Sequence, residues 1–277
     1  MASNNIPWVI TFTTQLPWPH VGVCYYTHWN EPVGEKIVHY LMHDYQLKNK
    51  LMKWSVSFIH VNLQASQANQ RYINHNMNRI RNKSFQSNSY EFARREELLS
   101  FFKQIDIVFD IHSTPKFSPC IGVTDTTFLS EAKMFFSTQE IRVDDMQRQW
   151  AMIGYFTAQG KPWFGIEAGS HQDKIGYEKW LLNIVNMLAY YGLIRGPLHQ
   201  VGHEAVYEFL EEIFCHDQSF VYARDFVGME KVSPWEIVAY EKNRIIKNSY
   251  SEDNIYFWLA CKKPLVWDGT GFFFRKV

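Results

Sequence analysis

Several features are missing from this chain, and each absence narrows its class. The 28 basic and 28 acidic residues cancel to a formal net charge of zero, so no overall field attracts nucleic acid or an anionic membrane. No CxxC pair occurs, and the wide cysteine spacing predicts reduced thiols in a cytosolic protein, with two disulfides as the open alternative. The four cysteines are Cys24, Cys120, Cys215 and Cys261.

Targeting and membrane-spanning patterns are also lacking. Residues 1–5 do not form a basic region followed by an apolar one, as a secretory signal would. The longest apolar stretch runs from Trp180 to Ile194, contains two asparagines and falls short of the roughly 20 residues that a spanning helix needs. We therefore expect a cytoplasmic enzyme with neither nucleic acid nor a membrane as its partner.

What is present predicts an α/β fold. Hydrophobic residues make up 46% of the 277 residues, enough for one large core and a smaller appended unit. Apolar runs at 21–26, 56–61, 107–110 and 163–166 are typical of strands, and helical patterns stand between and after them. Beyond Arg195-Gly196-Pro197 the pattern changes to short β-like runs. The sequence thus predicts a catalytic domain over 1–195 and a β-rich domain over 196–277.

Local signals predict where the helices begin. Asn30 can cap a helix whose first turn holds Pro32. Asn88 with Glu91 forms a plausible capping box for a helix over 91–104. The polar stretch 62–89 is too long for an ordinary connection, and connections of that length are usually functional or disordered.

Three residues suggest a metal site. His28 and Glu31 form a His-x-x-Glu pair, and His112 follows far downstream at the end of a predicted strand. Such a set can hold zinc with three protein ligands and one open position for water, whose pKa the metal lowers. A His-x-x-Glu pair by itself is most often a solvated pair, and His112 could simply be a buried histidine bonded to Asp110 or Ser113.

The surrounding motifs resemble those of the succinylglutamate desuccinylase/aspartoacylase family, zinc hydrolases related to the carboxypeptidases. Residues 26–34 are similar to the family motif Gly-Thr-His-Gly-Asn-Glu-x-x-Gly, with Tyr26 and Trp29 in place of two glycines. The resemblance runs from about Val21 to about Gly192 and fades in the β-rich part. Its other matches, in the expected order, are Asn62, Ala65, Arg71, Tyr72, Asn78, Arg79 and the run 110–114.

The resemblance implies a zinc carboxypeptidase-like mixed sheet and one zinc per chain, bound by His28, Glu31 and His112. It further implies that Glu167 is the catalytic glutamate, moving a proton from water to the leaving amine. Arg71 would stabilise the oxyanion. The alternative for Glu167 is a carboxylate placed at the start of a helix, where the dipole favours it.

The same resemblance assigns substrate binding to Asn78 and Arg79, because an arginine fork fits a carboxylate with two parallel hydrogen bonds. Solvated surface charge is the alternative for Arg71 and Arg79. The family's further arginine before the catalytic glutamate is replaced here by Thr157, with Lys161 the nearest cation.

Other residues keep open roles. Trp29 could narrow the pocket or only pack, and His171 could line the pocket. The histidines at 199, 203 and 216 predict no second metal site.

We therefore expect a zinc-dependent hydrolase that cleaves the amide of an N-acyl amino acid, with this small molecule as its partner. The β-rich domain would cap the active site. Two alternatives stay open: a zinc carboxypeptidase for short peptides, and a catalytically silent binding protein. The sequence leaves the acyl group, the amino acid and the assembly open, a homo-oligomer included.

Overall fold

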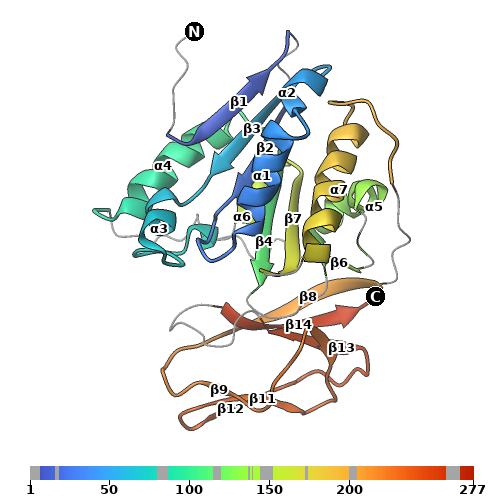
Figure 1. The fold of residues 1–277 in the computed structure, drawn as a ribbon. Helices are drawn as coiled ribbons and strands as arrows, with labels where there is room; N and C mark the ends of the chain where they lie inside the picture. Colours follow the sequence, from blue (N-terminus) through green and yellow to red (C-terminus); the bar gives the residue numbers. More distant parts are fainter. Residues whose placement is uncertain are drawn as a thin grey trace.

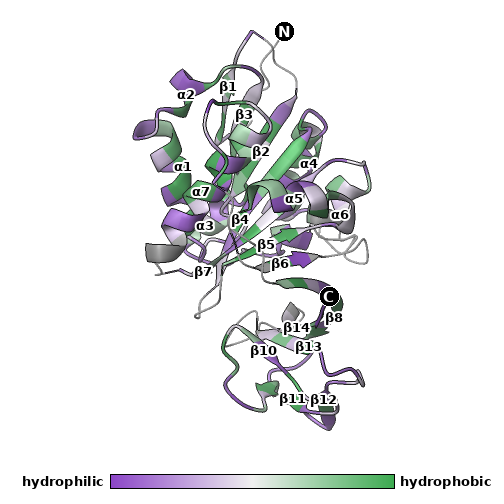
Figure 2. Ribbon diagram, turned by 90° about the vertical axis from the view of Figure 1, so that its right-hand side faces the viewer, coloured by the Kyte–Doolittle hydropathy of each residue, from purple (hydrophilic) through white to green (hydrophobic). Residues whose placement is uncertain are grey.

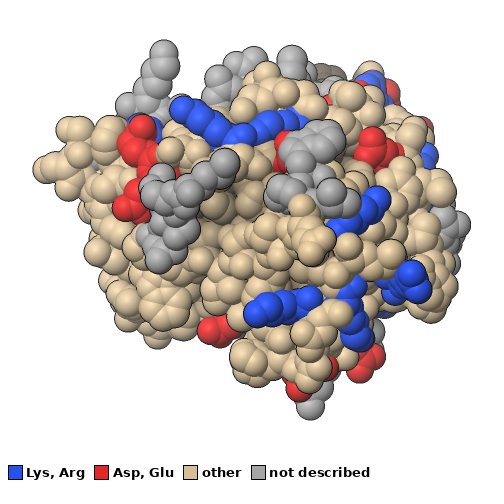
Figure 3. All heavy atoms as spheres, turned by 90° about the horizontal axis from the view of Figure 1, so that it is seen from above, with Lys and Arg blue, Asp and Glu red and all other residues tan. Residues whose placement is uncertain are grey.

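The structure is a computed structural model of the chain. It describes residues 7–15, 19–79, 87–114, 120–136, 138, 140–143, 152–171, 174–199, 205–259 and 269–277. An α/β unit stands above a smaller β unit, and a shared sheet runs through both (Figure 1). On the face seen from above, basic and acidic side chains are scattered among mostly uncharged residues (Figure 3).

The main sheet has 11 strands in the order β1-β3-β2-β4-β7-β5-β6-β8-β14-β13-β10. Its first seven strands in chain order are β1 Val9–Thr13, β2 His20–Tyr25, β3 Ser55–His60, β4 Ile107–Thr114, β5 Ile121–Thr124, β6 Glu140–Val143 and β7 Trp163–Ser170. Strands β3, β2, β4 and β7 are parallel neighbours, while β1 and β5 run antiparallel to β3 and β7. Their buried runs fit the apolar pattern of a sheet covered on both faces.

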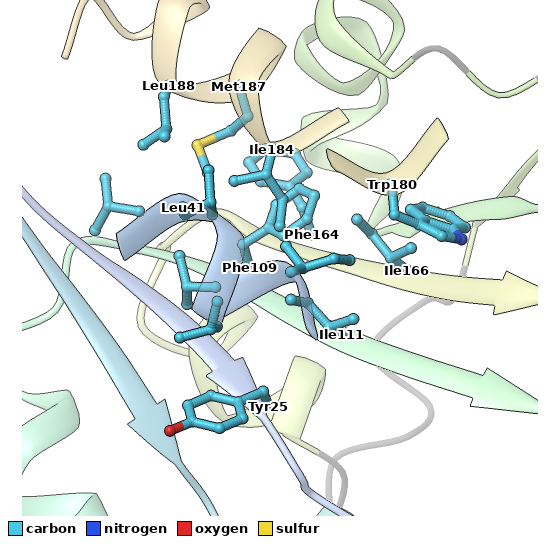
Figure 4. Packing of buried hydrophobic residues seen from close by; sticks show 14 of the residues in the cluster. Tyr25, Leu41, Phe109, Ile111, Phe164, Ile166, Trp180, Ile184, Met187 and Leu188 are labelled. Carbon is cyan, nitrogen blue, oxygen red and sulfur yellow. The ribbon is translucent and has the colours of Figure 1, made fainter. Parts of the chain in front are cut away.

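Helices cover both faces of this sheet. They are α1 Val33–His43, α2 Leu47–Lys50, α3 Leu63–Ala68, η1 Met77–Arg79, α4 Tyr90–Phe102, η2 Thr126–Phe128, α5 Leu129–Phe135, α6 Met152–Thr157 and α7 Lys174–Tyr190. Ile37 and Leu41 of α1 pack with Trp180 and Ile184 of α7 on one face (Figure 4). Phe102 of α4 belongs to the cluster on the opposite face, with residues of α6.

The alternation of side chains along β4 feeds both clusters. Phe109 and Ile111 lie in the first cluster, and Val108 lies in the second. Hydropathy colouring shows the same arrangement, with hydrophobic strands at the centre and hydrophilic segments on the outer helices (Figure 2). In the described part of the chain, no helix is both long and apolar enough to cross a membrane.

The predicted helix starts were wrong in detail. Pro32, not Asn30, is the N-cap residue of α1 and makes no side-chain cap bond; the Oδ1 of Asn30 instead accepts a hydrogen bond from Arg71. Helix α4 is capped by Ser89, whose Oγ accepts from the amide of Phe92 at 3.2 Å. No capping box forms with Asn88, because Glu91 turns into the protein interior and is fully buried.

Two strand ends and the long connection also differ from the sequence prediction. Strand β4 continues to Thr114 and β7 to Ser170, because these extensions pair with each other. His112 and Glu167 therefore lie inside strands rather than after them. The stretch predicted as one long loop holds α3 and η1, and Asn62 caps α3 by accepting from the amide of Ala65.

The C-terminal part forms the predicted β unit. It contains β8 Ala205–Phe214, β9 Val221–Tyr222, β10 Met229–Lys231, β11 Ile237–Glu241, β12 Arg244–Lys247, β13 Ile255–Leu259 and β14 Gly269–Lys276. Strand β8 pairs with β6 and extends the main sheet, while β12, β11 and β9 form a second sheet. Cys24 and Cys215 are free thiols, and Cys261 lies outside the described residues. We propose residue 195 as the boundary of the two units.

Candidate metal centre and active site

The candidate site lies where the parallel strands β2, β4 and β7 end. The carboxyl ends of parallel strands meet at one edge of a sheet, which is where ligands bind in open α/β folds. The segment after β2 carries His28 and Glu31, and the last part of β4 carries His112. Glu167 on β7 is the register neighbour of His112. Residues far apart in sequence therefore meet at this edge.

Two imidazole rings face one carboxylate. The Nδ1 of His28 lies 2.7 Å from Oε1 of Glu31, and the Nδ1 of His112 lies 2.8 Å from Oε2. All three side chains are buried, and one ligand atom from each lies within 4.8 Å of the others. Among the described residues, this is the one group of three or more such side chains that could hold a metal.

The other ring nitrogen of each histidine contacts an oxygen. The Nε2 of His28 lies 2.9 Å from Oδ1 of Asn76, and the Nε2 of His112 lies 3.0 Å from Oδ2 of Asp110. These oxygens accept, so each Nε2 carries a proton, while each Nδ1 faces the Glu31 carboxylate and can bind a metal once it is deprotonated. Partners of this kind fix the tautomer of metal-binding histidines. The contact of His112 with Asp110, which the sequence offered as the alternative to a ligand role, uses Nε2 and leaves Nδ1 facing Glu31.

Burial and charge set the ionisation of this group. Burial alone would raise the pKa of Glu31, but the positive charges and hydrogen bonds of His28 and His112 hold that pKa well below the usual carboxyl value. Burial, with the nearby Arg71, lowers the pKa of His28. Against its own burial, the carboxylates of Asp110 and Glu31 raise the pKa of His112. Binding of a metal by His112 therefore requires release of a proton.

Glu167 stands beside this group on the next strand. Burial raises the pKa of Glu167 against the opposing charges of His112 and Arg142, with the charge of Glu31 adding to the rise. A carboxyl group whose pKa is shifted toward neutral is suited to accept a proton and return it. The position and the environment of Glu167 both fit a proton carrier.

Arg71 approaches the metal group from the segment after α3. Its Nη1 donates to Oε1 of Glu31 at 3.1 Å. The backbone of this segment is anchored by Glu91, whose Oε1 accepts from the amide of Ile73 at 2.7 Å and whose Oε2 accepts from the amide of Asn74 at 3.2 Å. A buried carboxylate from α4 thus fixes the segment that carries Arg71.

Asn78 and Arg79 lie in the short helix η1. The amide of Asn78 donates to Oδ1 of Asn76, the same oxygen that contacts His28. The Nη2 of Arg79 donates to Oε1 of Glu212 on β8 at 2.6 Å, so its guanidinium meets the C-terminal unit. The backbone carrying the predicted substrate-binding pair is tied to the metal group, while the Arg79 side chain also contacts β8.

Sequence analysis missed several partners of this site. Asn76 stood out by no spacing, and Glu91 only by the spacing of a helix cap, because their actual partners lie far away along the chain. His171 lies close to the site: its Nδ1 is 2.8 Å from Oγ of Ser113, and its Nε2 is 3.5 Å from Nδ2 of Asn30. The sequence had left a pocket role open for His171, and these contacts place it beside Ser113 and Asn30.

Other residues considered from sequence have structural partners. Trp29 stacks on Tyr26 with ring centres 5.1 Å apart and donates its indole N–H to Asn69. The Nζ of Lys161 donates to three backbone carbonyls near the end of α4, so it does not replace the absent arginine. His216 pairs with Glu241, and His203 lies outside the described residues.

Together, the fold and the site define an open α/β protein with a candidate three-ligand metal centre at the carboxyl edge of its parallel strands. A family model, described as the succinylglutamate desuccinylase/aspartoacylase catalytic domain, matches residues 19–170. The chain belongs to this family of hydrolases. No curated protein sequence matches it significantly.

Solved structures share the fold at low sequence identity. Succinylglutamate desuccinylase from Vibrio cholerae is 14% identical with a TM-score of 0.74, over 93% of this chain and 81% of the other. A succinylglutamate desuccinylase/aspartoacylase from Rhodobacter sphaeroides is 16% identical with a TM-score of 0.70, over 95% and 87%. The product-bound ectoine utilization protein EutE (DoeB) from Ruegeria pomeroyi is 13% identical with a TM-score of 0.72, over 97% and 88%.

Proposed function

We propose that the protein is a zinc-dependent amidohydrolase of the cytoplasm that cleaves an N-acyl amino acid into a carboxylate and a free amino acid. The observation that carries this proposal is the convergence of His28, Glu31 and His112 within 4.8 Å, with Glu167 on the adjoining strand. Membership of the desuccinylase/aspartoacylase family supports the reaction class.

The three side chains fit zinc. Two imidazole nitrogens and one carboxylate are a donor set found in catalytic zinc sites, where a fourth position stays open. The contacts of Asn76 and Asp110 leave both Nδ1 atoms available, and the depressed pKa of Glu31 keeps its carboxylate ionised. When bound, zinc would polarise the scissile carbonyl and lower the pKa of a water molecule.

Side chains of the protein would transfer the proton and stabilise the negative charges. Glu167 accepts a proton from the attacking water and gives it to the amide nitrogen, because an amide leaves poorly until its nitrogen is protonated. Arg71 donates to the oxyanion that forms on the carbonyl oxygen when water attacks the carbonyl carbon; loss of one such donor typically costs on the order of 3 kcal/mol. Asn78 and Arg79 bind the carboxylate of the amino acid.

The size of the substrate follows from the C-terminal unit. Strand β4 points toward β8 and β14, which lie across the end of the α/β unit (Figure 1). Arg79 contacts this unit through Glu212. A cap at this place favours single acylated amino acids over long peptides, which argues against the carboxypeptidase alternative.

The test is a panel of acetyl-, succinyl- and formyl-amino acids with the zinc-loaded protein, measured by release of free amino acid. We expect turnover of at least one class, and loss of about 10²- to 10⁴-fold in kcat for Glu167→Gln, the range for general acid–base groups. Glu178→Gln, at an exposed position of α7, is the control. Preference for short peptides would support the carboxypeptidase, and no turnover with full zinc loading would support a silent binding protein.

A further inference from the structure

One face of the C-terminal unit is turned toward the α/β unit. Strands β8, β14 and β13 are neighbours in the main sheet, and a cluster of aromatic rings forms on this face. Arg142 of β6 lies over three of these rings, with its Cζ 5.3 Å from the ring centre of Trp258. Glu212 is the cross-strand partner of Phe272, a ring of the same cluster, so it lies on the same face.

Glu212 reaches the α/β unit through an ion pair. Its Oε1 accepts from Nη2 of Arg79 at 2.6 Å. The side chains are only 3% and 14% exposed, so both charges are shielded from water. A buried ion pair is weak evidence for stability, since desolvation offsets the attraction, so a role other than stability is worth testing.

The geometry leaves Arg79 able to bind a second anion. A guanidinium carries five N–H donors in a planar fork, and Glu212 accepts from one terminal nitrogen only. Among the described residues, Glu212 is the one side chain bonded to Arg79. Arg79 itself belongs to the three-residue helix η1.

We propose that Glu212 is a positioning residue that aims the Arg79 guanidinium at the substrate carboxylate. The inference rests on the proposed function and deepens it: the C-terminal unit sets the carboxylate-binding arm of a site built on the α/β unit. Without the carboxylate of Glu212, the Arg79 side chain samples more rotamers, and ordering it lowers the affinity for the substrate carboxylate.

A second ion pair on β8 supplies a matched control. Glu208 pairs with Arg275 at 2.6 Å, but both side chains are more than a third exposed and belong to the C-terminal unit alone. Glu208→Gln removes the same charge from the same strand without touching Arg79. A difference between the two variants is therefore specific to the pair that joins the units.

The experiment compares Glu212→Gln and Glu208→Gln on an N-acyl amino acid and on its carboxamide, which lacks the carboxylate. For Glu212→Gln we expect KM for the carboxylate substrate to rise about tenfold with kcat within about twofold, the pattern of lost uniform binding. Turnover of the carboxamide should match wild type. Glu208→Gln should match wild type on both substrates.

Other outcomes would overturn the role of Glu212. An unchanged KM, a lower KM (competition between Glu212 and substrate), or equal losses on both substrates would each do so. Should Glu212→Gln not fold, Glu212→Asp keeps the charge with a shorter reach, and a selective rise in KM for the carboxylate substrate is expected. A wild type inactive on every acyl amino acid would overturn the proposed function, and with it this role; an active wild type that Glu212→Gln matches overturns the role alone.

Discussion

Charged residues are arranged differently in the two units. At the edge of the α/β unit, the His28–Glu31 pair is about 5% exposed, and its members contact Asn76, His112 and Arg71 from distant segments. In the C-terminal unit, Arg224 pairs with Glu230 while 42% exposed. Exposed pairs add little to stability, whereas a buried charge without its partners is strongly unfavourable. Buried charges therefore indicate a functional site, because placing them there carries a possible cost in stability.

Removing a charge from the metal group should give the largest effect. Glu31→Gln keeps the shape of the side chain but removes the anionic ligand between the two imidazoles. We expect metal content to fall from one zinc per chain to near none, with loss of turnover, as elemental analysis and the amino acid release assay would show. Glu35→Gln, in the first turn of α1, should keep its metal. Full metal content in Glu31→Gln would remove Glu31 from the ligand set.

The next largest effect is expected from a change at Glu91, which anchors the segment that carries Arg71. In Glu91→Gln, one of the two carboxylate oxygens that face the amides of Ile73 and Asn74 becomes an NH2 group, which cannot accept a hydrogen bond. Leaving a buried donor unsatisfied lowers the free energy of unfolding by about 1–3 kcal/mol, measurable by denaturant titration. We also expect a lower kcat, because Arg71 is displaced. Glu178→Gln, at an exposed position of α7, should change neither quantity, and wild-type behaviour of Glu91→Gln would contradict the anchoring role.

Acid should destabilise the α/β unit through His60. Burial, with the nearby charge of Arg94, lowers the pKa of His60 from 6.5 to about 4. The unfolded chain then binds more protons than the folded one between these values, so stability falls as the pH drops from about 6.5 to about 4. His60→Phe should flatten this slope in denaturant titrations at several pH values. His43→Phe, at an exposed position, should leave the slope unchanged. An unaltered slope in His60→Phe would mean that other groups cause the acid destabilisation.

The smallest effect is expected for the exposed ion pairs of the C-terminal unit. Arg224→Gln removes two surface ion pairs, with Glu230 and Glu236. We expect the free energy of unfolding to change by less than about 1 kcal/mol, and less still at high salt. Activity should not change. A loss comparable to that of Glu91→Gln would mean that exposure does not separate the two classes of charge.

The sequence predicts those features of the molecule that depend on residues close together along the chain. The His28–Glu31 spacing is local, and the runs around β2, β3 and β4 are apolar enough to be recognised. Strands β5 and β6 span four residues each, too few to show a period. Glu91 resembles a capping residue in sequence, and only the fold turns it inward.

The candidate site could likewise be predicted only in part from the sequence. A family resemblance orders the residues along the chain, and the structure brings His28, Glu31 and His112 together. The contacts of Asn76 and Glu212 join segments 48 and 133 residues apart, respectively, and no composition or spacing encodes them. The roles of Glu167, Arg71, Asn78 and Arg79 in catalysis and binding stay predictions until the variants are assayed.

The pairing of β6 with β8 has a mechanical consequence. These strands run parallel over four residue pairs from Glu140 to Val143, so the two units share one hydrogen-bonded sheet. An outward swing of the C-terminal unit would break the hydrogen bonds between β6 and β8. Their backbone amides would then lack acceptors. We therefore expect substrate exchange not to depend on an outward swing of the C-terminal unit.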